Sequence, residues 1–325
     1  MAPGPTSRNK SNYDYAAHFR ERRLLHDLTV LPEDKKWRAV PPTEIEPHRV
    51  VLFLGCNVLM TSHMIRTVTD IFDLLAIDYV AVGGPAYCPG IVHHGHGDTE
   101  IAQAMGRNAV RHFERFEPER VVMWCPSCIY YYDEVFPVPA SFQTQHVTEF
   151  LAEQLSEVRF VHEVPQRVAL HYHTQGARRV AEANAAETLL SAVPGLEYVK
   201  IDGDIRLDRT CTEANQQALG KETWQYIIER QMRQAEEAGA DTVATLYHSC
   251  QRLVCVYEEM RSITVEHYLS VFARALGIQY EDIYKKYRLW RDPLRALAEM
   301  APCMQANQVR EDKAHGVVLK AFPEA

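Results

Sequence analysis

The sequence has no apolar run long enough to cross a membrane, no excess of basic residues and no secretory leader. No stretch reaches the roughly 18 consecutive apolar residues that a membrane helix requires, so we expect a protein that does not span a membrane. Its 43 acidic residues outnumber the 35 basic ones and give a net charge of −8, which argues against a nucleic-acid partner. Residues 1–11 lack an apolar segment and a cleavage pattern, which favours a cytoplasmic location.

Common nucleotide and hydrolase motifs are also missing. The sequence contains no Gly-x-Gly-x-x-Gly, no Walker loop, no Gly-x-Ser-x-Gly elbow and no His-Glu-x-x-His, so no site for NAD, FAD or ATP is evident. Eight cysteines at unequal spacing favour metal binding or redox chemistry over a disulfide framework in a cytoplasmic chain of 325 residues. If the chemistry is redox, electrons must pass to or from another protein of a complex.

Apolar runs alternate with helical patterns, which predicts an α/β fold whose strands pair in parallel. Strands are expected at residues 50–54, 79–82, 120–123, 168–171, 196–201 and 242–246. Helices are expected at residues 15–28, 60–75, 98–116 and 221–237. We divide the chain into an N-terminal extension (1–48) that docks on another surface, a first unit (49–160), a second unit (161–290) and a C-terminal tail (291–325).

The second half of the chain repeats the plan of the first. Related residues recur at nearly constant offsets, which are 122 from Cys128 to Cys250, 123 from Cys88 to Cys211 and 121 from His146 to His267. Similar offsets at three separated points indicate an internal duplication of one α/β unit. We therefore predict two pseudo-repeated Rossmann-like units with parallel sheets.

Four cysteines of the first half lie at the predicted ends of strands. Cys56 and Cys88 each follow a strand, and Cys125-Pro-Ser-Cys128 follows a third. The carboxyl ends of parallel strands meet at one edge of a sheet, so these sulfurs should converge there. Thiolates bind iron-sulfur clusters and soft metals, so the pattern favours an iron-sulfur site. A structural zinc site or a buried set of cysteines without metal are the alternatives.

This spacing resembles that of the cysteine-rich CCG domain family, which includes the B-subunit of heterodisulfide reductase. The family pattern is a cysteine, a gap, Cys-Cys-Gly, a second gap and Cys-x-x-Cys. Here the gaps are thirty-one and thirty-six residues, and the middle motif reads Cys88-Pro89-Gly90. The resemblance covers about residues 50–280. In the family, five cysteines hold a non-cubane cluster, whereas the four that remain here (Cys56, Cys88, Cys125 and Cys128) are the complement of a [4Fe-4S] cubane, which we therefore favour.

The corresponding positions of the second half carry fewer cysteines and more histidines. Candidate ligands there are His171, His173, Cys211, His248 and Cys250. This mixture of thiol and imidazole groups suits zinc. The alternatives are an empty ancestral site and a substrate pocket in which Cys250, His248 and Cys211 are catalytic. Arg178 and Arg179 match a basic position of the family at a helix start, where they would hold an anion, or else they form a solvated pair.

The resemblance implies an oxidoreductase of sulfur metabolism. It suggests an iron-sulfur redox subunit of a heterodisulfide reductase-like complex that acts on a thiol, disulfide or persulfide. The partners it implies are the ferredoxin-like and the flavin-bearing subunits of such a complex. Two alternatives stay open, namely an electron-transfer subunit of a lactate- or glycerol-phosphate-oxidising complex, and a non-catalytic metal-binding scaffold.

Overall fold

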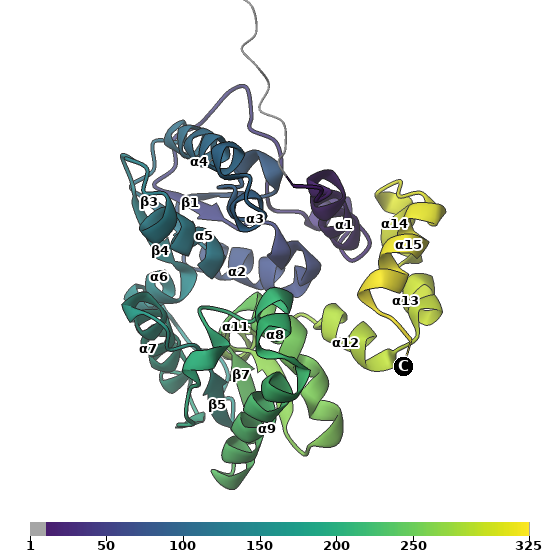
Figure 1. Ribbon diagram of the computed structural model, residues 1–325. Helices are drawn as coiled ribbons and strands as arrows, with labels where there is room; N and C mark the ends of the chain where they lie inside the picture. The colour runs from purple at the N-terminus through teal and green to yellow at the C-terminus, as the bar shows by residue number, and fades with distance from the viewer. Residues whose placement is uncertain (1–10, 325) are drawn as a thin grey trace, which may run out of the picture.

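Two α/β units lie one above the other in the computed structural model, which describes residues 11–324 (Figure 1). Helices from both ends of the chain flank the two units on one side. Among the described residues, no helix combines the length and the apolar character that crossing a bilayer demands.

The first unit is built on a four-stranded parallel sheet with strand order β2-β1-β3-β4. Its strands are β1 (Val50–Phe53), β2 (Tyr79–Val82), β3 (Arg120–Met123) and β4 (Gln143–His146). Its helices are α2 (Ser62–Leu74), α3 (Ile91–Gly95), α4 (Thr99–Glu114), α5 (Pro126–Tyr130) and α6 (Val147–Glu153). The central strand β1 is buried along its whole length, as expected for an apolar run in a sheet covered on both faces.

The second unit has the same architecture, with strand order β6-β5-β7-β8. Its strands are β5 (Arg167–His171), β6 (Glu197–Val199), β7 (Thr242–Thr245) and β8 (Thr264–His267). Its helices are α7 (Ala177–Ser191), α8 (Glu213–Leu219), α9 (Lys221–Glu237), α10 (His248–Val254) and α11 (Tyr268–Arg274). The predicted parallel α/β fold is confirmed. The strand predicted at residues 196–201 is shorter than expected, because only residues 197–199 pair with β5.

The two sheets share one strand order, and this supports the predicted duplication. In each sheet the strand that comes first in the chain, β1 or β5, lies second in the sheet and pairs with the third strand, β3 or β7. The register of the third strands equates Arg120 with Thr242, which is the 122-residue offset read from Cys128 and Cys250. The same offset equates Cys125 with Tyr247, so one cysteine of the first unit has an aromatic counterpart in the second.

The two units share a continuous apolar core. One cluster of buried side chains includes Val50 and Trp124 of the first unit together with Val168 and Val243 of the second. Two ring pairs cross the boundary, Trp124 with His267 and His146 with Tyr247, each with centroids 5.6 Å apart. The units are therefore joined through packed side chains.

His146 and His267 also have matching roles within their own units. Each is the last residue of its strand, and its Nδ1 accepts the backbone N–H two residues later, at 3.3 Å in both cases. The imidazole thus caps the helix that follows, α6 or α11. The 121-residue repeat seen in the sequence is a repeated strand end and helix cap.

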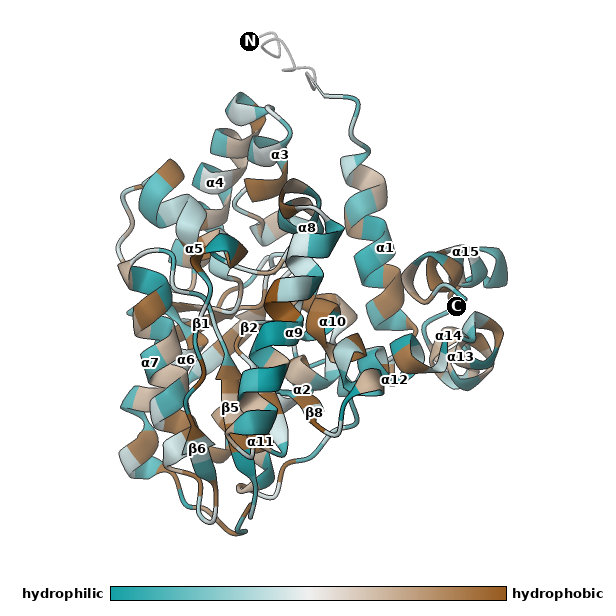
Figure 2. Ribbon diagram, turned by 60° about the horizontal axis from the view of Figure 1, so that its bottom comes forward, coloured by the Kyte–Doolittle hydropathy of each residue, from teal (hydrophilic) through white to brown (hydrophobic). Residues whose placement is uncertain are grey.

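The flanking helices come from both ends of the chain. They are α1 (Tyr15–Asp27), α12 (Ile283–Trp290), α13 (Pro293–Glu299), α14 (Ala301–Ala306) and α15 (Glu311–Ala321). Leu25 and Leu28 share a separate apolar cluster with Val317 and Phe322, so the helix predicted at residues 15–28 docks on the C-terminal helices. In Figure 2, α1 lies between α15 and the two α/β units.

Candidate metal centres at the strand ends

The four cysteines of the first unit are buried at the carboxyl edge of its sheet. Cys56 follows β1, Cys88 follows β2, and Cys125 and Cys128 lie at the start of α5 after β3. Their exposed fractions are 8%, 4%, 7% and 2%. The ends of β1 and β3 lie close together, since a Cβ added to Gly55 would be 3.2 Å from the Cβ of Cys125. The structure therefore places all four thiols at the predicted edge.

Electrostatic interactions connect the four thiols. Burial, followed by the neighbouring Cys125, raises the pKa of Cys56 to about 12. The pKa values of Cys88 and Cys128 are also raised, with the other cysteines among the causes. Cys125 differs, because a hydrogen bond from Cys128 holds its pKa below the usual value despite burial. Three buried thiols that resist ionisation beside one that ionises more readily are suited to a cation that compensates several thiolates.

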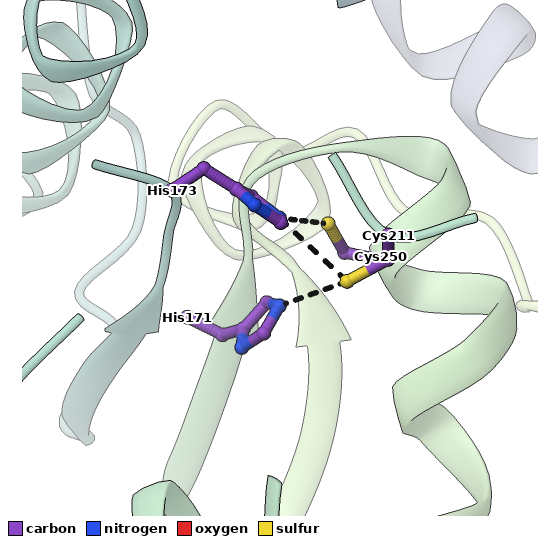
Figure 3. A group of neighbouring side chains, drawn as sticks. All are labelled: His171, His173, Cys211 and Cys250. Carbon is purple, nitrogen blue, oxygen red and sulfur yellow. Dashed lines mark hydrogen bonds between the residues drawn. The ribbon is translucent and has the colours of Figure 1, made fainter. Parts of the chain in front are cut away.

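The cysteines and histidines of the second unit form a tighter group. Within residues 11–324, one set of at least three His, Cys, Asp or Glu residues has ligand atoms that all lie within 4.8 Å of one another, and it consists of His171, His173, Cys211 and Cys250 (Figure 3). His171 Nε2 lies 3.3 Å from Cys211 Sγ, and His173 Nε2 lies 3.1 Å from Cys250 Sγ. All four residues are buried.

Hydrogen bonds turn both imidazoles so that Nε2 faces the sulfurs. Nδ1 of His171 lies 2.8 Å from Gln231 Oε1, and Gln231 Nε2 donates to the Asp202 carbonyl, which fixes the orientation of the amide. Nδ1 of His173 lies 3.0 Å from the Asp208 carbonyl. Because both acceptors are oxygens, each Nδ1 carries a proton, and in the neutral ring Nε2 keeps the lone pair with which it can bind a metal. Outer hydrogen bonds of this kind are typical of metal-ligating histidines.

The two sulfurs of this group differ in acidity. Burial raises the pKa of Cys250, but a hydrogen bond from Cys211 and the charge of His173 outweigh it and hold that pKa well below its usual value. Burial and the neighbouring Cys250 raise the pKa of Cys211 well above its usual value. Two sulfurs of different acidity and two imidazole Nε2 atoms therefore meet at one point.

His248 is not part of the close set. It is the first residue of α10, it is buried, and its Nδ1 has no hydrogen-bond partner among the described residues. Burial, followed by the charge of Arg252, lowers its pKa to about 3, so its ring is neutral. Cys255, which belongs to neither group, is completely buried.

Comparison with known proteins identifies the first unit. Residues 50–131 match the family model of the CCG cysteine-rich domain. This part of the chain is similar to the CCG cysteine-rich domain. The chain is also 25% identical over 255 residues to the D-subunit of the dihydromethanophenazine:CoB--CoM heterodisulfide reductase of Methanosarcina barkeri, and 21% identical over 271 residues to the protein of the same name from Methanosarcina acetivorans.

These alignments cover 74% and 79% of this chain, and the chain spans 62% and 66% of the length of the two relatives. Among solved structures, the aspartate racemase of Picrophilus torridus aligns over 74% of this chain and 99% of its own, with 14% identity and a TM-score of 0.30. A TM-score this low supports no conclusion about a shared fold or activity.

The two adjacent arginines at the start of α7 have different surroundings. Arg178 is half-buried, and its Nη2 lies 3.4 Å from both the Thr144 carbonyl and Glu149 Oε2. Arg179 is 3% exposed and forms a 2.7 Å ion pair with Glu182, which is completely buried. The alternative of a solvated arginine pair is therefore wrong for Arg179.

The buried ion pair of Arg179 and Glu182 is coupled to residues of both candidate sites. The charge of Arg179 contributes to lowering the pKa of Cys125. Tyr247 donates a hydrogen bond to Glu182, and its ring lies 5.5 Å from the ring of His173. Burial raises the pKa of Glu182 to about 7 even though Arg179 and Tyr247 oppose this shift. The Arg179–Glu182–Tyr247 contacts thus lie beside His173, and the charge of Arg179 acts on Cys125.

Sequence reasoning missed the residues that orient the second centre. Gln231 lies on α9, far from any ligand in the sequence, whereas Asp208 lies in a loop three residues before Cys211. Asp208 has a positive φ of 57°, which non-glycine residues seldom adopt, and its carbonyl is the acceptor for His173. Strain at a non-glycine residue is often found at a functional site.

Proposed function

We propose that this protein is an iron-sulfur redox subunit of a heterodisulfide reductase-like complex. The observation that carries the proposal is the set of four buried cysteines at one sheet edge of a CCG domain. The substrate of the complex would be a thiol, a disulfide or a persulfide. The weak similarity to the D-subunit of heterodisulfide reductase supports this choice.

In this proposal Cys56, Cys88, Cys125 and Cys128 hold the cluster. Four thiolates are the complement of a [4Fe-4S] cubane, which we favour over a non-cubane cluster because Pro89 stands where a fifth thiolate would be needed. When bound, the cluster would supply one-electron transfer to or from sulfur. The chain's own contributions are burial, which excludes water, and the charge of Arg179, which favours the thiolate form of Cys125.

For the second centre we propose a mononuclear zinc ion bound by His171, His173, Cys211 and Cys250. Tetrahedral zinc with bonds of roughly 2.0–2.3 Å needs ligand atoms roughly 3.3–3.8 Å apart. The His–Cys contacts of 3.1, 3.3 and 3.6 Å are close to that spacing before any ion is added. Without an ion, the same geometry would present Cys250 as a reactive thiolate, with Cys211 and His248 beside it.

The partners follow from the chemistry. A single cluster accepts one electron at a time, whereas splitting a disulfide consumes two electrons and two protons and yields two thiols. Electrons must therefore arrive from other proteins of the complex, and we propose that these are its ferredoxin-like and flavin-bearing subunits. We also propose that the protein works in the cytoplasm.

Metal analysis of anaerobically purified protein tests the cluster. We expect brown protein with about four irons per chain. The Cys125→Ser variant should lose the iron, and the Cys255→Ser variant, which alters another buried thiol outside both centres, should keep it. Colourless, iron-free wild-type protein with zinc in the first unit would overturn the proposal.

An activity assay tests the reaction. Reduced methyl viologen would serve as the electron donor and glutathione disulfide as the probe substrate, with one disulfide consumed for every two viologen radicals oxidised. We expect turnover that disappears in Cys125→Ser together with the iron. Iron-loaded protein that reduces neither this disulfide nor a persulfide would favour a purely electron-transferring role.

A further inference from the structure

A cavity of about 820 Å³ lies between the two α/β units and the flanking helices. Its walls come mainly from α1, α8, α10, α12 and α15, and of its lining residues only Met60 and His96 lie within residues 50–131 of the CCG domain. Pockets of roughly 300–1,000 Å³ are typical of sites for small molecules. The cavity is thus formed mainly by the flanking helices and the second unit.

The acidic groups of the lining already have partners. Glu21 pairs with Lys320 at 2.7 Å, and Glu213 pairs with Arg252 at 3.0 Å. The carboxylate of Asp14 accepts the backbone N–H of Ala17 at the start of α1. The lining also contains Arg22 and Arg288, so its cations outnumber its carboxylates although the whole chain carries a net charge of −8.

Arg22 brings a second guanidinium close to Arg252. Its hydrogen bonds are to neutral acceptors, the side-chain oxygen of Asn57 and the His18 carbonyl at 2.9 Å. Burial lowers the pKa of Arg22, and the charge of Arg252 lowers it further while Cys56 opposes the shift. Glu213 offsets the charge of Arg252, whereas the hydrogen-bond partners of Arg22 are neutral, so an anion beside Arg22 would be stabilised.

Two buried nitrogens of the lining lack partners. His18 Nε2 and Arg252 Nε have no hydrogen-bond partner within the described part of the chain, although the two residues are only 7% and 9% exposed. Buried polar atoms are nearly always satisfied by protein, water or ligand. Both atoms belong to residues that line the cavity.

We propose that this cavity binds a small organic anion whose carboxylate, phosphate or sulfonate group lies between Arg22 and Arg252. Arg22 contacts Asn57, the residue after Cys56, and Arg252 follows Cys250 by two residues on α10. The bound anion therefore lies beside residues adjacent to both candidate metal centres. The binding of an anion in this cavity does not depend on the proposed function. The further claim that this anion is the substrate rests on the proposed function.

Isothermal titration calorimetry of the full-length protein at low ionic strength tests the site, with citrate, inorganic phosphate and coenzyme A as probes. We expect saturable one-to-one binding of at least one probe. Arg22→Gln and Arg252→Gln should each weaken binding about tenfold or more, because each removes a charged hydrogen bond. Arg20→Gln is the matched control, since Arg20 lies on the same helix but is exposed and does not line the cavity.

The proposal is wrong if no probe binds, if Arg22→Gln binds as tightly as the wild type, or if Arg20→Gln weakens binding equally. Should Arg252→Gln fail to fold, Arg22→Gln and Arg22→Lys still decide the question. Iron content measured on the same samples separates the two proposals. Iron-containing protein without anion binding refutes only the cavity, and anion binding by iron-free protein refutes only the cluster.

Discussion

The two cysteine sites occupy matching places in two copies of one fold, but they offer a metal different groups. The first presents four thiols, whereas the second presents two thiols and two imidazoles. Cys125 and Tyr247 are equivalent by register, and so are Phe53 and His171, the last residues of β1 and β5. The duplicated backbone therefore determines where the candidate ligands lie. Substitutions at the strand ends determine which thiol and imidazole groups are offered to a metal there.

The largest effect is expected when one of the two equivalent cysteines, Cys128 or Cys250, is removed. Cys128→Ser should abolish iron binding and leave zinc in place, and Cys250→Ser should release zinc and leave iron in place, because each sulfur belongs to one site. Elemental analysis of both metals in both variants measures this. If either variant loses both metals, the two sites are not independent.

A second prediction concerns the ion pair between the sites. The pKa of Glu182 is raised to about 7 from 4.5, so its stabilising contribution is complete below about pH 4.5 and is lost as the pH rises through about 7. A shift of this size corresponds to about 3 kcal/mol. In urea unfolding from pH 4.5 to 8, the stability of Glu182→Gln relative to wild type should rise by about that amount.

The matched control for this experiment is Glu187→Gln, which alters a more exposed carboxylate on the same helix. Its stability relative to wild type should not follow the same curve. A flat difference for Glu182→Gln across this range would show that the carboxylate is ionised throughout, as it would be if Arg179 outweighed burial.

The orientation of His171 gives a third prediction, limited to the second site. Gln231→Leu removes the acceptor for His171 Nδ1 and should weaken zinc binding about 10- to 100-fold. Competition with a chromophoric zinc chelator measures the affinity. Gln234→Leu, which removes a hydrogen bond to Asp202 on the same helix face, should leave it unchanged. Equal affinity in Gln231→Leu would mean that Gln231 does not orient a ligand.

The smallest predicted effect lies just after Cys88 in the first unit and its counterpart Cys211 in the second. In the second unit, Thr212 caps α8 by accepting the backbone N–H of Asn215 at 3.0 Å, whereas α3 of the first unit starts from Gly90 without a side-chain cap. Thr212→Ala should therefore cost about 1 kcal/mol in urea unfolding. No loss of stability would indicate that α8 is held by other contacts.

The sequence could predict the elements that are marked by apolar runs. The strands at 50–53, 79–82, 120–123 and 242–245 were recognisable because buried parallel strands consist of consecutive apolar residues. The strands β4 and β8 were not predicted. Each has only four residues and lies at the edge of its sheet, β4 has no apolar residue, and β8 has one, Val265. The recurrence of His146 and His267 was the signal that could have revealed them.

The candidate sites were predictable to the extent that strand ends carry ligands. Cysteine spacing placed four thiols at one edge, and the repeat placed His171, Cys211 and Cys250 at the other. The sequence could not show that His248 stands apart from this group, or that Gln231 orients a histidine. These facts depend on which way a helix turns its side chains across a packed interface, and spacing along the chain does not determine that.

The packing of the first helix against the last has a consequence for how the chain is made. Glu21 pairs with Lys320 across 299 positions, and Asn307 donates hydrogen bonds to the carbonyls of Asp27 and Val30. At about 5–20 residues per second, a ribosome needs roughly 15–60 s to travel that distance. During this time Leu25 and Leu28 have no C-terminal helices to cover them, and the anion cavity lacks its α12 and α15 walls. The binding site thus exists only on chains whose synthesis has passed these helices.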